Sequence, residues 1–398
     1  MTKDYAQREK PAPYKRWGRN IEPDSIRQIE NACALPVAVA GALMPDAHPG
    51  YGLPIGGVLA TDNAVVPYAV GVDIACRVKM SVLDLPVKTL DDEEEALTQA
   101  IKAETRFGIG AAFQGQHKRR HEVMEADWSV LSSVPKADKD KAWSQLGTSG
   151  SGNHFVEFGT FTVERALEGL DSGTYLAFLS HSGSRGTGAA VADYYSKLAQ
   201  RLLPDLPREL RHLAWLDMDE EGGEYWAAME LMGQYAAANH ACIHRHIVER
   251  LGAEVLLDIE NHHNFAWKEE HGGREVIVHR KGATPAGQGV LGIIPGSMAS
   301  PAFAVRGKGD HDSLLSAAHG AGRVMSRKKA KKTLDWRDAE KVLAARNVTL
   351  ISAGLDEVPF VYKDIEAVMA DQSDLVKVEG RFDPRLVKMA PHGERPED

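Results

Sequence analysis

Apolar residues recur at helical spacing in three parts of the chain. The longest is the alanine-rich stretch 225–251, and shorter candidates cover 90–107 and 335–345. Apolar side chains that return every three or four residues line one face of a helix. The stretch 90–107 also opens with an acidic turn, which suits the positive end of a helix dipole. The pattern therefore predicts helices over these three stretches.

Short apolar runs between these stretches predict strands. They cover 34–39, 78–83, 175–179 and 275–278. Runs of this length between polar segments are typical of buried strands. The order of the elements does not repeat a strand–helix–strand unit. We therefore predict an α+β fold with mixed sheets, and neither a Rossmann nor a TIM fold.

Glycine-rich polar segments separate these elements. Many of the 37 glycines fall in segments 45–57, 147–154, 180–188, 281–296 and 317–323. Glycine lets the backbone turn tightly or approach a ligand closely. A loop-rich protein without a site there would have such segments too, but these also hold most of the side chains that could bind a ligand. We expect the functional site to be built from them.

Composition and charge limit the class of protein. The 398 residues contain no run of 18 apolar residues, and the N-terminus lacks the apolar segment of a secretory signal. Three cysteines are too few for a disulfide framework. We therefore expect a cytoplasmic protein with no membrane partner. The formal net charge of −9 would repel nucleic acid, so a polyanionic substrate would need local basic groups or bound cations.

Several polar side chains near the apolar runs could bind a metal ion. They are Asp73, Cys76, His154, His181 and the pair His262–His263. Mixed carboxylate, thiolate and imidazole ligands suit Mn, Fe, Co or Zn better than Mg or Ca. A lone cysteine is more often a small buried residue, and a lone loop histidine is more often hydrogen-bonded at the surface. The recurrence favours a metal site, although spacing alone does not establish that these residues converge.

Two turns of small residues could hold a phosphate group through backbone N–H groups. They are 295–298 (Pro-Gly-Ser-Met) and 319–323 (His-Gly-Ala-Gly-Arg), and neither is a Walker A or dinucleotide-binding motif. His319 could be a nucleophile or a structural histidine, and the residues alone favour neither. The basic runs 117–121 and 327–332 could be solvated faces or could hold a phosphate backbone. The second run directly follows His319, which favours substrate binding there.

Six longer motifs, in order along the chain, resemble the RtcB family of RNA ligases. They are Met-Pro-Asp-Ala-His-Pro-Gly-Tyr-Gly (44–52), Gly-Val-Asp-Ile-Ala-Cys (71–76), Gly-Asn-His-Phe (152–155), His-Ser-Gly-Ser-Arg-Gly (181–186), His-Arg-Lys-Gly-Ala-Thr (279–284) and His-Gly-Ala-Gly-Arg (319–323). The resemblance implies an RtcB-like fold with mixed sheets flanked by helices and a central metal-lined cleft. It also implies a single catalytic domain over residues 1–398.

The family joins RNA ends that carry a 2′,3′-cyclic phosphate or a 3′-phosphate to 5′-hydroxyl ends, using GTP and Mn²⁺. The resemblance therefore implies an RNA ligase that acts in tRNA splicing or RNA repair. It would form a histidine–GMP intermediate on His319 and then an activated RNA 3′-end. Some members of the family also need an archease-type activator.

The resemblance also assigns residues to roles. Two Mn²⁺ ions would be held by Asp73, Cys76, His154, His181 and His263, the last chosen over His262 because it precedes an asparagine. The nucleotide would contact Asn153, Glu157, Asn264, Pro295, Gly296, Ser297, Met298, His319, Gly320, Ala321, Gly322 and Lys388. Arg185 and Arg323 would contact the RNA substrate.

Two departures from the family pattern keep alternatives open. Ala302 stands where the family has a serine, which leaves guanine specificity open, and the chain continues beyond Lys388 to Asp398. The change at Ala302 motivates one alternative, a metal-dependent RNA-end phosphatase or cyclic phosphodiesterase without ligation. Another alternative is a non-catalytic RNA-binding protein that keeps the fold, but such a protein has no need of Cys76 in a metal site.

Overall fold

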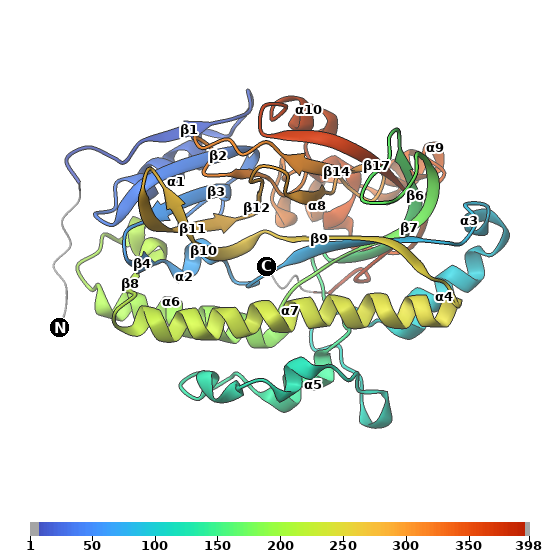
Figure 1. Cartoon of the computed structure of the whole chain (residues 1–398), viewed down its shortest axis with the longest axis horizontal. Coiled ribbons are helices and arrows are strands. Elements are labelled where there is room, and N and C mark those ends of the chain that lie inside the picture. The colour runs from blue at the N-terminus through green and yellow to red at the C-terminus, as the bar shows by residue number, and fades with distance from the viewer. Residues whose placement is uncertain (1–7, 395–398) are drawn as a thin grey trace.

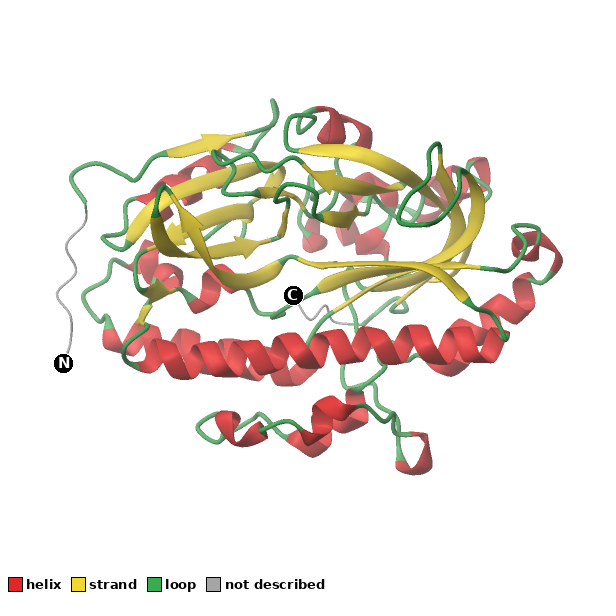
Figure 2. Ribbon diagram, in the orientation of Figure 1, coloured by secondary structure: helices red, strands yellow, loops and turns green. Residues whose placement is uncertain are grey.

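Two β-sheets lie on a layer of long helices in the computed structural model, which describes residues 8–394 (Figures 1 and 2). The larger sheet has the strand order β13-β14-β17-β6-β7-β5-β9, and β16 pairs with β17. Its strands are β5 (Arg77–Leu83), β6 (Phe155–Val163), β7 (Gly173–Ser182), β9 (Val255–His262), β13 (Leu291–Ile294), β14 (Ala302–Gly307), β16 (Thr349–Ser352) and β17 (Val376–Met389).

The smaller sheet has the order β1-β2-β3-β11-β10. Its strands are β1 (Tyr14–Arg16), β2 (Ala38–His48), β3 (Ile55–Thr61), β10 (Asn264–His271) and β11 (Arg274–Lys281). Two short pairs join β12 (Ala283–Pro285) to β15 (Ser316–Ala318) and β4 (Ala64–Val65) to β8 (Leu216–Asp217). Only His263 separates β9 from β10, so the chain passes from one sheet to the other at this residue.

The strand pairing is mixed, as predicted, and excludes a parallel barrel or a doubly wound sheet. Within residues 8–394, the named strands pair in parallel only at β1–β2 and β16–β17, and all their other pairs are antiparallel. A TIM barrel or a Rossmann sheet would require parallel neighbours throughout. The prediction of an α+β protein is therefore confirmed.

The helices are α1 (Pro23–Cys33), α2 (Pro67–Val70), α3 (Thr89–Asp92), α4 (Glu94–Glu104), α5 (Lys139–Gln145), α6 (Arg185–Leu202), α7 (Glu221–Leu251), α8 (Arg327–Thr333), α9 (Trp336–Ala345) and α10 (Ile365–Ala370). Helices α6 and α7 run beneath the sheets, α10 lies above them, and α3 and α4 lie at one end of the molecule (Figure 1). The longest, α7, runs beneath the sheets and buries Tyr225, Met232 and Tyr235 in the largest apolar core. In the part of the chain that is described, no helix has the length and apolar character needed to cross a membrane.

Predicted and observed helices agree best where the apolar pattern is long. The stretch 225–251 is α7, which begins four residues earlier at Glu221, and 335–345 corresponds to α9. The stretch 90–107 is instead divided into α3 and α4, because Glu93 leaves the helical backbone conformation (φ −132°, ψ 29°). Helices α1 and α6 were not predicted, and α6 begins at Arg185, inside the predicted loop 180–188.

Three predicted strands are confirmed and one is mostly wrong. The runs 78–83, 175–179 and 275–278 lie within β5, β7 and β11. The run 34–39 is mostly a turn, because the residues after α1 close its last turn and β2 starts only at Ala38. Strand β2 then extends through His48, into the segment that was predicted to be a loop.

A buried histidine makes the stability of the fold depend on pH. His279 of β11 is fully buried, accepts a hydrogen bond at Nε2 from the Val66 N–H (2.9 Å) and donates from Nδ1 to the Leu59 carbonyl (3.0 Å). Burial lowers its pKa to about 4. The unfolded chain therefore binds a proton below a pH of roughly 6.5, whereas the folded chain does not until about 4.

We expect this histidine to lower the free energy of unfolding as the pH falls from 6.5 towards 4, by up to roughly 3 kcal/mol. Urea denaturation in the presence of a chelator, compared at pH 7 and pH 5, measures the effect. His279→Gln should show a smaller loss between the two pH values than the wild type. His117→Gln, at an exposed position, is the control. An unchanged loss in His279→Gln would contradict this account.

Candidate metal centre and catalytic pocket

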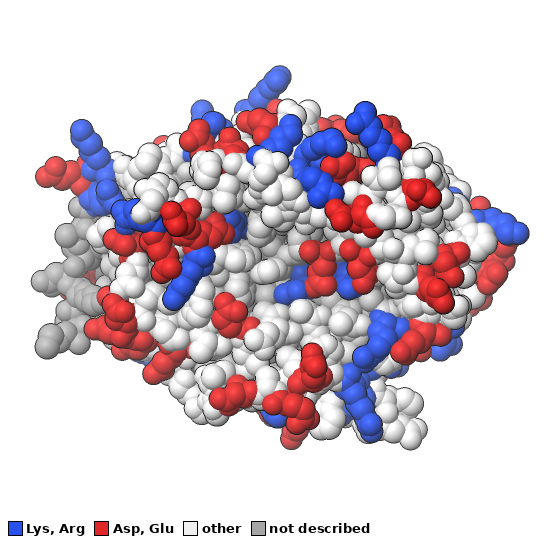
Figure 3. Space-filling view, viewed as in Figure 1, with Lys and Arg blue, Asp and Glu red and all other residues white. Residues whose placement is uncertain are grey.

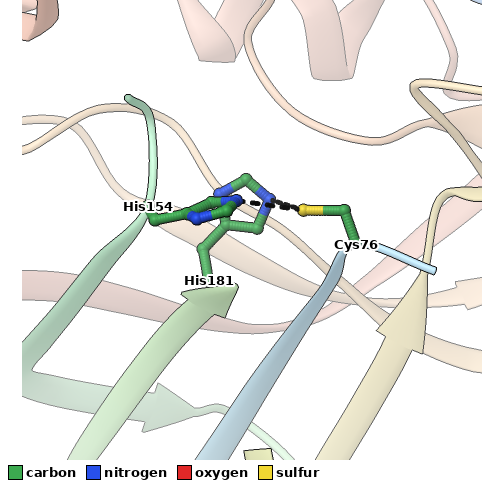
Figure 4. Close-up of side chains that lie close together, drawn as sticks. All are labelled: Cys76, His154 and His181. Carbon is green, nitrogen blue, oxygen red and sulfur yellow. Dashed lines mark hydrogen bonds between the residues drawn. The ribbon is translucent and has the colours of Figure 1, made fainter. Parts of the chain in front are cut away.

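Three predicted metal ligands meet at one end of the larger sheet (Figure 4). Cys76 immediately precedes β5, His154 immediately precedes β6, and His181 lies near the end of β7. Because β6, β7 and β5 are neighbours in the sheet, their ends bring these side chains together. The Cys76 Sγ lies 3.1 Å from His181 Nε2 and 3.4 Å from His154 Nε2. The three residues are buried and are arranged so that they could hold a metal ion.

Asp73 and His263 extend this group. The Asp73 Oδ2 lies 3.0 Å from His154 Nε2, and His263 Nε2 lies 3.2 Å from His181 Nε2. His262 packs against Trp267 instead, with ring centroids 5.0 Å apart. The five side chains expected to bind metal therefore form one continuous cluster, which we call the ligand cluster.

The electrostatics of the ligand cluster suit a cation. His181 donates from Nδ1 to the Asn153 carbonyl (3.0 Å), so its Nε2 carries a lone pair that faces the cluster. Burial and the neighbouring His154 lower the pKa of His181 to about 3, and burial also lowers the pKa of His263 well below its usual value. Burial would raise the pKa of Asp73, but its hydrogen bond to His154 and nearby positive charge lower it to about 2. The unprotonated imidazoles of His181 and His263 and the ionised carboxylate of Asp73 are therefore in the state that binds metal.

His319 lies beside the ligand cluster and is oriented by a buried carboxylate. Its ring centroid is 4.8 Å from that of His263, and its Nδ1 donates to Asp46 Oδ2 at 2.7 Å. The His319 backbone N–H reaches the same oxygen at 3.2 Å. Because Nδ1 holds the proton, the lone pair is on Nε2, as a nucleophilic histidine requires. Asp46 is fully buried in β2.

The turn after His319 fits closely around Asp46. Gly322 has a positive φ of +74°, and a Cβ at this position would overlap the Asp46 carbonyl oxygen. A side chain here would therefore displace the residue that orients His319.

One pocket contains the ligand cluster, His319 and both turns of small residues. Of the residues expected to contact the nucleotide, its lining includes Asn153, Glu157, Asn264, Pro295, Gly296, Ser297, Met298, His319, Gly320, Ala321 and Gly322. Burial raises the pKa of Glu157 to about 8, so this carboxyl group is mostly protonated at neutral pH and can donate a hydrogen bond. Asn264 also supports the pocket wall, because its side chain bonds the Asp73 carbonyl (3.2 Å) and the Gly282 N–H (2.8 Å).

The two arginines expected to bind RNA lie in different positions. Arg323 lines the pocket, but its guanidinium already contacts Glu357 (3.3 Å) and the Asp356 carbonyl (2.8 Å). Arg185 is buried behind the ligand cluster, where its Nη1 lies 3.3 Å from His154 Nδ1. Its position supports a role in holding His154 more directly than a role in contacting RNA.

Lys388, which was expected to contact the nucleotide, lies outside the pocket lining. Its neighbours Val387 and Met389 line the pocket, and side chains alternate between the two faces of a strand. On the other face of β17, the Lys388 amine bonds Ser352 Oγ (2.9 Å) and lies 5.0 Å from the centre of the Phe107 ring.

Ala302 also lies away from the pocket. It is buried in β14, in an apolar cluster with Ile293, Ala304 and Phe382. The hydroxyl groups of this turn come from Ser297 and Ser300, which bond each other at 2.9 Å. The alanine therefore removes no hydroxyl from the pocket lining.

Asp46 is a site residue to which the sequence assigned no role. It lies within the motif 44–52, but nothing in that motif indicates which later histidine it contacts. The 273 residues that separate it from His319 hide the pair from any argument based on spacing.

The fold and the pocket together define an α+β protein whose central cleft combines a possible metal site with an oriented histidine. The model of the family described as tRNA-splicing ligase RtcB matches residues 28–389. The RNA-splicing ligase RtcB of Escherichia coli (strain K12) is 35% identical over 397 residues, covering 92% of this chain and 95% of that protein. The tRNA-splicing ligase RtcB of Nanoarchaeum equitans is 31% identical, with 92% and 91% covered. The RNA-splicing ligase RtcB of Mycobacterium tuberculosis is 30% identical, with 90% and 98% covered. The chain therefore belongs to the RtcB family of RNA ligases, and it is an enzyme.

Proposed function

We propose that this enzyme joins RNA ends that carry a 2′,3′-cyclic phosphate or a 3′-phosphate to 5′-hydroxyl ends, with GTP as the energy source and two Mn²⁺ ions as cofactors. The observation that carries the proposal is the geometry of His319. Asp46 fixes its proton on Nδ1, and its ring lies against His263 of the ligand cluster. A histidine held in this way suits attack on a phosphorus atom.

The ligand cluster fits the proposed metal ions. Asp73, Cys76, His154, His181 and His263 would hold them through one carboxylate, one thiolate and three imidazoles. Bound Mn²⁺ would supply positive charge that offsets the negative charge developing during phosphoryl transfer.

In the first proposed step, His319 Nε2 attacks the α-phosphorus of GTP. A P–N bond forms, the bond to the bridging oxygen of the β-phosphate breaks, and pyrophosphate leaves. The Nδ1 proton remains on His319, where Asp46 stabilises the positive charge that the ring gains. The turns 295–298 and 319–322 would hold the nucleotide phosphates through backbone N–H groups.

The next two steps transfer the nucleotide to RNA and then release it. An oxygen of the RNA 3′-phosphate attacks the phosphorus on His319, the P–N bond breaks, and Nε2 regains its lone pair. The 5′-hydroxyl then attacks the RNA 3′-phosphorus and expels GMP, and the hydroxyl proton passes to solvent. A 2′,3′-cyclic end is first opened by water to the 3′-phosphate. Positioning supplies most of the catalysis in transfers of this kind.

Covalent labelling with α-labelled GTP tests this function. With Mn²⁺, the wild type should form an adduct that is stable to base and labile to acid, and His319→Ala should form none. The same preparation should join a 3′-phosphate RNA to a 5′-hydroxyl RNA. A wild type that takes up no label, or a His319→Ala variant that labels normally, would overturn the proposal.

The alternative of an end-processing enzyme without ligation now has less support. It was motivated by Ala302, and this residue lies outside the pocket lining. RNA ends that are processed without GTP but never joined in its presence would favour this alternative.

We also propose that the described chain acts as one catalytic unit. Residues from His48 to Met389 contribute to a single pocket, and the late strand β17 pairs with β6 and β14. If the early and late segments were in separate chains, neither chain would contain the whole pocket lining.

The RNA strand would approach the pocket along helix α8. Acidic and basic side chains are interspersed on the face of the molecule in Figure 3, which therefore offers no continuous basic surface. Binding of the RNA phosphates requires a basic surface elsewhere. Helix α8 supplies one, because Lys328, Lys329 and Lys332 are exposed nine to thirteen residues after His319 in a chain of net charge −9. Arg327, at the start of α8, pairs with Glu357, which also contacts Arg323 of the pocket.

The other basic run, 117–121, is largely used in packing. Arg119 pairs with Glu104 (2.8 Å) and covers the Phe113 ring, and Lys118 covers Trp143. Its charges are therefore less available for RNA than those of α8.

We expect the combined change Lys328→Gln, Lys329→Gln and Lys332→Gln to weaken RNA binding by about 10-fold. The slope of the logarithm of the binding constant against the logarithm of the salt concentration should become less steep by about 2. Fluorescence anisotropy of a labelled single-stranded RNA, titrated at several salt concentrations, measures both effects. Lys118→Gln is the matched control, and labelling of His319 by GTP should be unchanged in every variant. An unaltered salt slope in the triple variant would exclude α8 as the RNA contact.

A further inference from the structure

The centre of helix α7 carries three buried polar side chains that the catalytic steps above do not use. Asn239 and His240 are fully buried, and His244 is 3% exposed. Elsewhere the buried face of α7 is mainly apolar and packs in the core. Burying polar groups in a helix is unfavourable unless they are hydrogen-bonded. Their partners therefore indicate what these residues do.

Asn239 holds the loop that leads to His154. Its Oδ1 accepts from the Gly147 N–H at 2.7 Å, and its Nδ2 donates to the Thr148 carbonyl at 2.9 Å. The same Nδ2 lies 3.1 Å from Ser182 Oγ, on the strand that carries His181. One amide group thus connects the segments that supply two of the three imidazoles of the ligand cluster, His154 and His181.

His240 and His244 contact strand β7, which carries His181, on the face opposite the ligand cluster. Ser180 and Ser182 flank His181 on β7, so their side chains point away from the ligand cluster and towards α7. His240 Nε2 donates to the Ser182 carbonyl (3.1 Å), which leaves Nδ1 to accept from Ser180 Oγ (2.9 Å). Because a carbonyl oxygen can only accept, it fixes the direction of both hydrogen bonds that His240 makes. His244 Nε2 lies 2.8 Å from the same Ser180 Oγ, and its Nδ1 lies 2.7 Å from Ser81 Oγ on β5.

These hydrogen bonds hold the backbone of the two segments that carry His154 and His181. The Ser182 hydroxyl also bonds the Ser149 carbonyl at 2.8 Å, so the loop and the end of β7 are tied together on the α7 side. His181 and His154 project from these same segments, on the pocket side, to within 3.4 Å of Cys76 Sγ. A shift of either segment would change the separation of the ligand atoms.

We propose that Asn239 and His240 are positioning residues of the metal centre, which hold His154 and His181 at the separation needed to share a metal ion. This inference rests on the metal binding in the proposed function. Residues that orient ligands without touching the metal typically change metal affinity by 10- to 100-fold. The backbone route here is distinct from the contact of Asn153 with the His181 ring.

Titration of the full chain with Co²⁺ tests the proposal, because the thiolate-to-cobalt absorption of Cys76 reports the geometry of the site without any turnover. Asn239→Asp keeps the size and the acceptor but loses the amide donors, and His240→Gln keeps a donor near the position of Nε2 but loses the acceptor at the position of Nδ1. We expect each variant to bind Co²⁺ about 10- to 100-fold more weakly and to shift the absorption band.

Met232→Ala is the matched control for a loss of stability alone. Met232 is fully buried in the same helix and in the apolar core, so its truncation destabilises the fold without removing a polar contact to either segment. We expect its Co²⁺ affinity to stay within about twofold of the wild type. If one variant fails to fold, the other still decides the question.

Co²⁺ affinities within about twofold of the wild type in both polar variants would overturn the proposal. So would a parallel loss of affinity in Met232→Ala. A wild type that binds Co²⁺ but never forms the His319 adduct would overturn the proposed function and leave this inference standing. A wild type that binds no Co²⁺ would overturn both.

Discussion

Asp46→Asn is expected to slow the formation of the GMP adduct on His319 by about 10³- to 10⁴-fold. The amide can turn its NH₂ group towards Nδ1, which moves the ring proton to Nε2 and removes the lone pair that attacks. The new side chain also cannot stabilise the charged ring. Replacing the orienting aspartate of a catalytic histidine by asparagine has an effect of this size in serine proteases.

Rapid-quench measurement of labelled GMP on the protein gives the rate directly. Because Asp46 contacts His319 and not the ligand cluster, Co²⁺ binding should stay close to that of the wild type. Unchanged Co²⁺ binding would show that the slower reaction does not result from a disrupted pocket. A rate within about tenfold of the wild type would show that Asp46 does not orient the nucleophile.

Cys76→Ser should lower the affinity for Mn²⁺ and Co²⁺ by at least about 100-fold and abolish the thiolate-to-cobalt absorption. Serine is nearly the same size, but its hydroxyl does not ionise at neutral pH, so the cluster loses a negative ligand. The Cys76 sulfur lies within 3.4 Å of His154 Nε2 and His181 Nε2, and it is the one sulfur atom of the ligand cluster.

Cys242→Ser provides the control for Cys76→Ser. Cys242 is equally buried, and burial raises its pKa to about 11, so it remains a thiol that packs against its neighbours. Isothermal titration should therefore give wild-type affinity for Cys242→Ser. Equal losses in the two variants would mean that the thiol of Cys76 acts only through packing.

Local patterns in the sequence predicted much of the fold. The periodicity of 225–251 predicts α7 because a long helix repeats its apolar face many times, and the strands β5, β7 and β11 each contain a short stretch rich in apolar residues. The start of α6 was missed because Arg185, Gly186 and Gly188 are typical of a loop. The end of α1 was misread for a related reason, since a helix terminus and a strand can both be apolar.

The residues of the candidate site could be identified from the sequence, but their positions relative to one another could not. Spacing places Asp73 and Cys76 on one turn, yet His154, His181 and His263 meet them only through the strand order β6-β7-β5-β9. Pairing between distant strands depends on the whole core, and no local pattern encodes it. Resemblance to a family supplied the ligand set, whereas Asp46, Asn239 and His240 become visible only through the contacts they make.

His263 is the single residue between β9 and β10, and it is also a member of the ligand cluster. The direct connection between the two sheets therefore lies within the candidate metal site. A rotation of one sheet against the other would have to move this imidazole away from His181. A metal ion bound to both imidazoles would oppose that rotation. Removal of the metal should therefore increase hydrogen exchange on both sides of His263, including strands that contribute no ligand.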